Sequence, residues 1–191
     1  AVVGHSGKTF GEGLDGLRDA LAARGVSDPL WLVVDDGALL TDKAREAVDK
    51  GADLVITWGG DGTVQCCADA LAGSGVPMAI MPAGTANLLA ANLGVPQDID
   101  EALDIALDGR RVKLDVGRAN GEVFAVMAGA GMDALVIGGA DDDVKAKIGR
   151  LAYIASAAKS VRADPFVAEI EIDGEQFFSG EATCVLLGNV G

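Results

Sequence analysis

The stretch that decides the fold is Leu54-Val55-Ile56-Thr57-Trp58-Gly59-Gly60-Asp61-Gly62-Thr63, an apolar run that ends in a glycine-rich turn. Leu54–Trp58 is typical of a buried strand, and Val64–Leu71 is typical of a helix. Glycines at 59, 60 and 62 leave the backbone N–H groups of the turn open to an anion, and the dipole of the following helix favours negative charge. The stretch therefore predicts a phosphate-binding loop, although Gly and Asp are also ordinary turn residues.

Asp61 stands inside this loop, where a carboxylate would repel a bare phosphate group. We therefore expect it to bind Mg²⁺ or to orient a reacting hydroxyl group. The chain has one His, His5, and three Cys, of which Cys66 and Cys67 are adjacent, so neither residue type offers the usual spacing of metal ligands. Any metal is then held by oxygen, which favours Mg²⁺ brought in with a phosphate substrate.

A second loop of the same kind follows the next apolar run, Met78–Met81. It reads Pro82-Ala83-Gly84-Thr85-Ala86-Asn87 and leads into an apolar helix. If the two strands are neighbours, the loops bring the hydroxyls of Thr63 and Thr85 and the amide of Asn87 into one crevice at the edge of the sheet. The pair of loops therefore predicts a polar, nucleotide-sized site.

Residues 1–108 alternate short apolar runs with helical patterns. Strands are expected at Ala1–Val3, Leu30–Val34, Leu54–Trp58 and Met78–Met81. Helices are expected around Leu14, Leu17 and Leu21, at Asp42–Lys50 with Thr41 as N-cap, and at Val64–Leu71, Leu88–Leu93 and Ile99–Leu107. This alternation predicts an α/β domain with a doubly wound parallel sheet, in which ligands bind beyond the carboxyl ends of the strands.

The pattern changes after residue 108, where hairpin signals replace the alternation. Asn120-Gly121 separates the runs Val112–Arg118 and Glu122–Ala128, and Asp173-Gly174 separates Ala168–Ile172 and Gln176–Phe178. Ala182–Leu187 predicts a further strand, left as an unpaired edge, and a helix is expected over Lys145–Arg162. We therefore expect a second, antiparallel β-rich domain over residues 109–191, truncated at its carboxyl end because the chain stops directly after an apolar strand.

The composition is that of a globular chain with a strong acidic excess. Its 191 residues include 15 Lys and Arg against 29 Asp and Glu, which gives a net charge of −14. A chain this acidic binds nucleic acid phosphates poorly, which predicts no nucleic acid partner. No apolar run approaches the ~20 residues that span a bilayer, and no signal peptide precedes the first strand, so we expect a cytoplasmic protein.

Four motifs in one order resemble those of the diacylglycerol kinase catalytic domain family, which includes bacterial lipid kinases and the sphingosine and ceramide kinases. They are Gly59–Thr63, Pro82–Ala90, Val112–Gly117 and Ala128–Ala134. The resemblance implies ATP as phosphoryl donor, Mg²⁺ as its metal, and a diacylglycerol-like or sphingoid-like lipid as acceptor. It further implies that Gly59–Thr63 and Gly84–Asn87 are the ATP loops, that Asp61 is required for activity, and that Asp115 is a second active-site acid.

The chain departs from the family pattern at three places. The family opens with N-P-x-S-G, and the matching stretch here is Val3-Gly4-His5-Ser6-Gly7, so Ser6 and Gly7 are the nucleotide contacts that the resemblance retains. Gln65 and Cys66 stand where many members carry Asn and Glu. The family's general base lies in an Asp-Gly-Glu turn near its far carboxyl terminus, beyond Gly191. Asp173-Gly174-Glu175 comes too early in the family order and is interpreted as a hairpin turn.

Other interpretations of these motifs remain open. NAD kinase also carries G-G-D-G-T, but an N-x-G-x-L-G-F motif would follow, and this chain has Pro82–Asn87 instead. A nucleotide-binding module without catalysis would also contain two glycine loops. Gly7-Lys8-Thr9 lacks the first glycine of a P-loop, and Gly129–Ala134 follows a hairpin strand, not a βαβ unit, so neither predicts a nucleotide site. The sequence leaves open a homodimer and a transient contact with a membrane surface.

Overall fold

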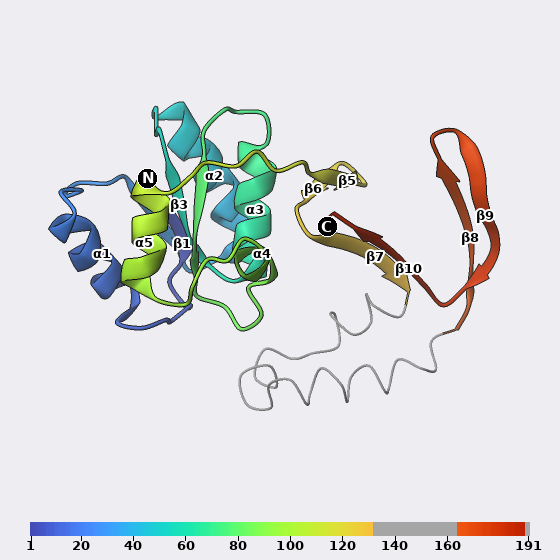
Figure 1. Cartoon of the computed structure of the whole chain (residues 1–191), viewed down its shortest axis with the longest axis horizontal. Coiled ribbons are helices and arrows are strands. Elements are labelled where there is room, and N and C mark those ends of the chain that lie inside the picture. Colours follow the sequence, from blue (N-terminus) through green and yellow to red (C-terminus); the bar gives the residue numbers. More distant parts are fainter. Residues whose placement is uncertain (132–163, 190–191) are drawn as a thin grey trace. The chain divides into compact units, whose positions relative to one another are not determined.

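The computed structural model describes residues 1–131 and 164–189, which form two compact units, Ala1–Val126 and Met127–Asn189. The first unit contains a four-stranded parallel sheet with the strand order β2-β1-β3-β4 (Figure 1). Its strands are β1 (Val2–His5), β2 (Trp31–Val34), β3 (Val55–Gly59) and β4 (Met78–Pro82). The four strands expected in this part of the chain are therefore confirmed.

Helices cover both faces of this sheet, as the sequence predicts (Figure 1). They are α1 (Gly13–Ala23), α2 (Leu40–Asp49), α3 (Asp61–Leu71), α4 (Leu88–Asn92) and α5 (Ile99–Asp108), with the 3-10 turn η1 (Gly37–Leu39) before α2. Leu17 of α1 and Leu103 of α5 pack with Trp58 on one face. Ala47 of α2 and Cys67 of α3 pack on the other. The result is a three-layer α/β/α unit held by apolar burial on both sides of the sheet.

The central strands β1 and β3 approach each other closely because β1 carries a glycine. Gly4 lies opposite Trp58 in the parallel ladder, and a Cβ at Gly4 would lie 2.7 Å from the Trp58 Cβ. Trp58 is fully buried, and its indole N–H donates to the backbone carbonyl of Lys8 at 3.1 Å. This bond ties the loop after β1 to β3.

Two helix starts differ from those expected. α3 begins at Asp61, so Asp61, Gly62 and Thr63 form its first turn and do not precede it as a loop. α2 begins at Leu40, which places Thr41 inside the helix, so the prediction that Thr41 is the N-cap is wrong. Asp36 caps the preceding turn η1 instead, its carboxylate accepting from the N–H of Ala38 at 2.9 Å, and Asp is a stronger capping residue than Thr.

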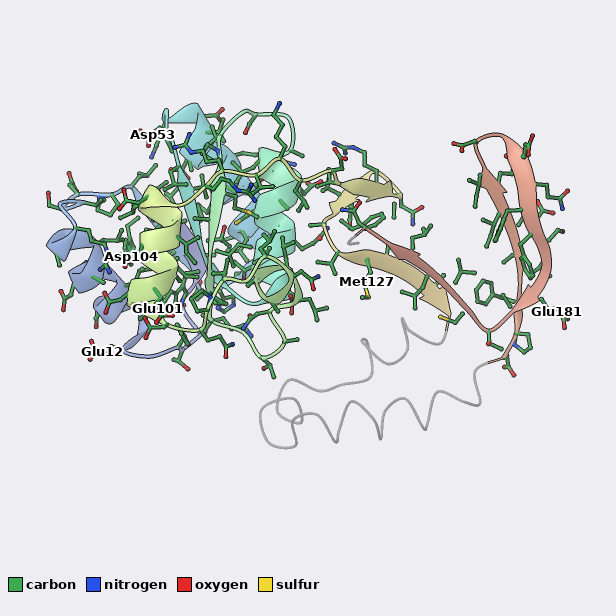
Figure 2. All side chains as sticks on the ribbon, viewed as in Figure 1. Glu12, Asp53, Glu101, Asp104, Met127 and Glu181 are labelled. Atoms are coloured by element: carbon green, nitrogen blue, oxygen red, sulfur yellow. The ribbon has the colours of Figure 1, made fainter. Side chains whose placement is uncertain are left out.

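Arg24, directly after α1, ties α1 to α5. Its guanidinium donates to Asp100 at 2.8 Å and to Asp104, labelled in Figure 2, at 2.9 Å. These hydrogen bonds raise the pKa of Arg24 above its usual value. Because both carboxylates are exposed, water screens the ion pairs, and the buried leucines of the two helices contribute more to the stability of this layer.

The remaining described strands form antiparallel pairs. β5 (Gly117–Ala119) pairs with β6 (Glu122–Phe124), and β8 (Phe166–Ile172) pairs with β9 (Glu175–Ala182), so both predicted hairpins are confirmed. Asn120 and Asp173 have φ angles of 52° and 54°, as two-residue hairpin turns require. β10 (Cys184–Gly188) pairs with β7 (Met127–Gly131), so the prediction of an unpaired last strand is wrong. Residues 110–116, expected in part as a strand, lie outside any strand.

The β5–β6 hairpin belongs to the first compact unit. Val123 of β6 is fully buried, and its N–H donates to the carboxylate of Asp69 on α3 at 3.1 Å. The mixed architecture, a parallel core sheet together with antiparallel pairs, confirms the predicted fold class. The residue ranges of the two domains, 1–108 and 109–191, stay a prediction.

Two expectations concern segments outside those strands. The helix predicted over Lys145–Arg162 lies outside the described residues, as does the end of the Ala128–Ala134 motif. Within residues 1–131 and 164–189, no helix combines the length and the apolar character that crossing a bilayer requires.

Candidate functional site

The loops predicted to form a site leave the same edge of the parallel sheet. The chain passes from β1 to β2 on one side and from β3 to β4 on the other, so β1 and β3 flank a topological switch point. Open parallel sheets bind ligands beyond the carboxyl ends of their strands at such a point. Ser6 and Gly7 follow β1 there, and Gly60 follows β3.

The loop after β3 runs directly into α3. Gly60 is the N-cap residue, with an extended backbone, and no side chain caps the N–H groups of the first turn. Uncapped N–H groups at a helix start carry partial positive charge and favour an anion. The start of α3 can therefore bind a phosphate group.

The three glycines of this loop meet different surroundings. A Cβ at Gly59 would overlap the side chain of Thr63, which is buried in the first turn of α3. A Cβ at Gly60 would lie 3.0 Å from the Cα of Gly84 in the loop after β4. A Cβ at Gly62 would meet no atom within 4 Å, and Gly62 is not in the left-handed region. Packing therefore explains glycine at 59 and 60, and the fold does not require it at 62.

The side chain of Asn87 closes the loop after β4. Its Oδ1 accepts from the N–H of Gly84 at 2.9 Å, and its Nδ2 donates to the carbonyl of Gly84 at 2.8 Å. A longer bond of 3.4 Å joins Nδ2 to the carbonyl of Pro82. Asn87 has a left-handed backbone, with φ of 49°, and is 5% exposed. Its amide is thus used within the loop, while Thr85 is exposed.

Asp61 joins the two loops. Its Oδ1 accepts from the N–H of Leu88, the first residue of α4, at 2.6 Å. The N-cap residue of α4 makes no capping bond, so Asp61 supplies the negative charge that a helix start favours. The other carboxylate oxygen of Asp61 has no hydrogen-bond partner among the residues that the structure describes. One carboxylate therefore sets the spacing of both loops and keeps a second oxygen unengaged.

A shallow pocket of about 280 Å³ adjoins the loop after β4. Thr85 and Asn87 contribute to its wall together with Ala90, Val95 and Gln97. This volume is close to the lower end of those found for small-ligand sites. Val95 and Gln97 belong to no motif, so sequence reasoning missed them, and nothing in their pattern indicates a pocket.

The loop after β1 is held by its own backbone and by His5. The N–H of Ser6 donates to the carbonyl of Val34 at 2.7 Å, and the N–H of Gly7 donates to Nδ1 of His5 at 2.9 Å. A neutral His5 that accepts at Nδ1 carries its proton on Nε2. Ser6 and Gly7 are exposed after the carboxyl end of β1, and their role as nucleotide contacts stays a prediction.

The structure brings together the two predicted loops but not every predicted side chain. The expected crevice lined by two hydroxyls and an amide is formed only in part, because Thr63 is buried and Asn87 bonds inward. Thr85 supplies the exposed hydroxyl. Asp115 lies in the exposed segment between α5 and β5, and its role as a second acid stays a prediction.

The part of the chain that the structure describes has no group of three His, Cys, Asp or Glu side chains that could hold a metal ion by itself. Mg²⁺ at phosphate-transferring sites is ordinarily bound through one or two carboxylates together with substrate phosphates and water. Asp61, beside a helix start that favours phosphate, fits this mode of binding.

Known proteins resemble this chain in both sequence and fold. Residues 5–119 match the diacylglycerol kinase catalytic domain. A diacylglycerol kinase of Bacillus subtilis is 33% identical over 151 residues, which cover 77% of this chain and 50% of that protein. A Cronobacter sakazakii protein named as a probable lipid kinase, YegS-like, is 36% identical over 158 residues, which cover 78% and 52%. The crystal structure of a diacylglycerol kinase from Bacillus anthracis str. Sterne is similar, with a TM-score of 0.76 and 31% identity, over 99% of this chain and 63% of that one.

The matched region contains both glycine loops and Asp61. The chain spans about half the length of these two curated relatives. The family match covers more than half of the chain, and the fold agrees with that of a solved relative. The chain therefore belongs to the diacylglycerol kinase catalytic domain family.

Proposed function

We propose that this chain provides the ATP site of a lipid kinase, which transfers the γ-phosphoryl group of ATP to the hydroxyl of a diacylglycerol-like or sphingoid-like lipid. The names of the relatives support a lipid acceptor. Two touching loops at a topological switch point support a nucleotide donor. In this proposal residues 1–108 form the nucleotide-binding domain, residues 109–191 belong to the acceptor domain, and the enzyme is cytoplasmic and contacts a membrane surface transiently.

The glycine at position 62 is the observation that most supports a nucleotide site at this loop. Its backbone is of a kind that any residue adopts, and a side chain there would enter open space. Glycine is a poor helix former, so a glycine in the first turn of α3 costs stability that alanine would restore. A phosphate group bound against the N–H groups of this turn gives a physical reason for the missing side chain.

The other loop residues hold the nucleotide in the same proposal. The hydroxyl of Thr85 donates to a phosphate oxygen, and Gly84 allows the backbone of its loop to come close. Ser6 and Gly7 contact the nucleotide from the end of β1. Phosphoryl transfer needs little covalent help from the protein, so residues that position and neutralise the phosphates supply most of the catalysis.

Asp61 is the proposed Mg²⁺ ligand, through the carboxylate oxygen that is not bonded to Leu88. When bound, Mg²⁺ neutralises charge on the phosphoryl group being transferred. Asp115 is the proposed second acid, and its part is to orient the acceptor side of the site.

Asp61→Asn tests the charge at this position. Asparagine keeps an oxygen that can accept from the N–H of Leu88, so we expect the fold to be retained. In the full-length enzyme, which includes the region of the expected general base, transfer of labelled phosphate from ATP to extracted lipids is expected to fall by roughly 10²-fold or more, because the charge that binds Mg²⁺ is lost. Asp61→Ala is the matched comparison, since it removes the charge and the loop contact together. Wild-type turnover of Asp61→Asn with unchanged Mg²⁺ dependence would contradict the proposal.

The same assay separates the proposal from its alternatives. Transfer to NAD and not to lipid would identify a nucleotide kinase. Binding of ATP by the full-length protein without transfer to either acceptor would identify a nucleotide-binding module without catalysis. Either result would overturn the lipid kinase proposal and leave the nucleotide site in place.

A further inference from the structure

The buried amide of Asn87 lies between the two contacts that join the loops. We propose that Asn87 is a positioning residue, which holds the loop after β4 in the shape that presents Gly84 and Thr85 to the nucleotide and does not itself contact the ligand. The effect on nucleotide binding rests on the proposed ATP site, whereas the effect on the loop does not.

The hydrogen bonds of Asn87 leave no free N–H donor on its side chain for a phosphate group. A primary amide has two N–H donors and one acceptor oxygen. Nδ2 is bonded to the carbonyls of Gly84 and Pro82, so both donors are used. Phosphate oxygens need donors, and only the oxygen of Asn87, already bonded to the N–H of Gly84, has a lone pair left. At 5% exposure the side chain is also nearly closed to solvent.

The position of Asn87 makes the loop shape depend on it. On one side, Gly84 packs against Gly60, and a Cβ at Gly84 would lie 2.6 Å from Oδ1 of Asn87. On the other side, the next residue, Leu88, donates its N–H to Asp61. The left-handed backbone of Asn87 makes the turn between these two contacts, and Asn tolerates that conformation better than most residues. Loss of the amide bonds therefore loosens both contacts with the loop after β3.

Asn87→Gly tests this role, because glycine keeps the left-handed backbone and removes the amide. The readout is amide hydrogen exchange at Gly84 and Leu88 in the nucleotide-free chain, followed by calorimetric titration with Mg·ADP. We expect exchange at these two amides to become about ten-fold faster or more. The Gly84 N–H loses its hydrogen bond to Asn87, and the Leu88 N–H keeps its bond to Asp61 in a loop that is less well held. We also expect ADP binding to weaken. Asn120→Gly is the matched control, since Asn120 has the same left-handed backbone in an exposed turn, and it should change neither readout.

Thr85→Val is the contrasting variant, and it should weaken ADP binding without faster exchange in the free chain. If Asn87→Gly weakens ADP binding but leaves the exchange rates unchanged, Asn87 is a ligand contact and the proposal is overturned. No change in either ADP binding or exchange would also overturn the proposal. Asn87→Asp, which keeps the size and the acceptor oxygen but sets an oxygen against the two carbonyls, gives a second measurement if Asn87→Gly does not fold. If the parent chain binds no ADP, the ATP site is refuted, and the exchange rates still decide whether Asn87 holds the loop.

Discussion

Gly62→Ala should make the protein more stable and its nucleotide binding weaker. The added Cβ meets no atom within 4 Å, and the backbone at Gly62 is not left-handed, so the folded chain accepts the methyl group without strain. Alanine stabilises a helix interior by about 0.8–1.0 kcal/mol relative to glycine, and we expect roughly half of that stabilisation in the first turn of α3. For a domain of this size, about 0.5 kcal/mol raises the melting temperature by about 1–2 °C.

Nucleotide binding should respond in the opposite direction. In the proposed site a phosphate oxygen lies against the N–H groups of the first turn, in the space that the methyl group would enter. Displacing it costs at least one hydrogen bond to a charged group, which is worth about 1.5–3 kcal/mol. Binding of Mg·ADP should therefore weaken by about 10- to 150-fold.

Thermal denaturation and calorimetric titration of the same preparation measure both effects. A higher melting temperature with unchanged ADP affinity would show that no ligand approaches the start of α3, and the assignment of the nucleotide to this loop would be lost. A lower melting temperature would show that the space around Gly62 is filled, which contradicts the packing described above.

Three further predictions concern packing and ionisation. Gly84→Ala should lower the free energy of unfolding by about 1–3 kcal/mol, because its Cβ would overlap the Cα of Gly60; an unchanged urea midpoint would show that the loops part freely. Hydrogen bonds from two lysines lower the pKa of Glu46 to about 2, so its contribution to stability is complete above about pH 4.5 and is lost as the pH falls towards 2. The difference in melting temperature between Glu46→Gln and the parent should shrink across that window, and a constant difference would argue against the ion pairs. Burial raises the pKa of Cys67 to about 11, so alkylation at pH 8 should leave Cys67 unmodified until denaturant is added, as peptide mass spectrometry can establish.

The sheet and the hairpins can be predicted from sequence because their causes are local. Val55–Gly59 lies in an apolar run of strand length that ends in glycine, and few other structures suit such a run. Asn120-Gly121 and Asp173-Gly174 take the positive φ angles that their hairpin turns need, at low cost. In each case the residues that form the element also determine its shape.

The starts of helices and the directions of side chains are harder to predict because distant residues decide them. Asp61, Gly62 and Thr63 form the first turn of α3 although Asp and Gly are weak helix formers, and Asp61 is bonded to Leu88, 27 residues away. Asn87 looks the same in sequence whether its amide binds a ligand or its own backbone. Only the path of the loop around Asn87 shows that the amide is used internally.

The two oxygens of Asp61 explain why the site can be formed before any ligand arrives. Oδ1 holds the N–H of Leu88 and so keeps α4 against the loop after β3 in the free chain. A cation bound at the second oxygen leaves that bond in place, so the loops need not move on binding and little ordering entropy is lost at that moment. The Gly60–Gly84 contact acts in the same direction, because backbone packed on backbone has few alternative arrangements. Charge removal in Asp61→Asn should therefore weaken binding without disordering the loops, whereas Asp61→Ala should do both, and equal loop exchange rates in the two variants would show that the Leu88 bond does not hold the loops together.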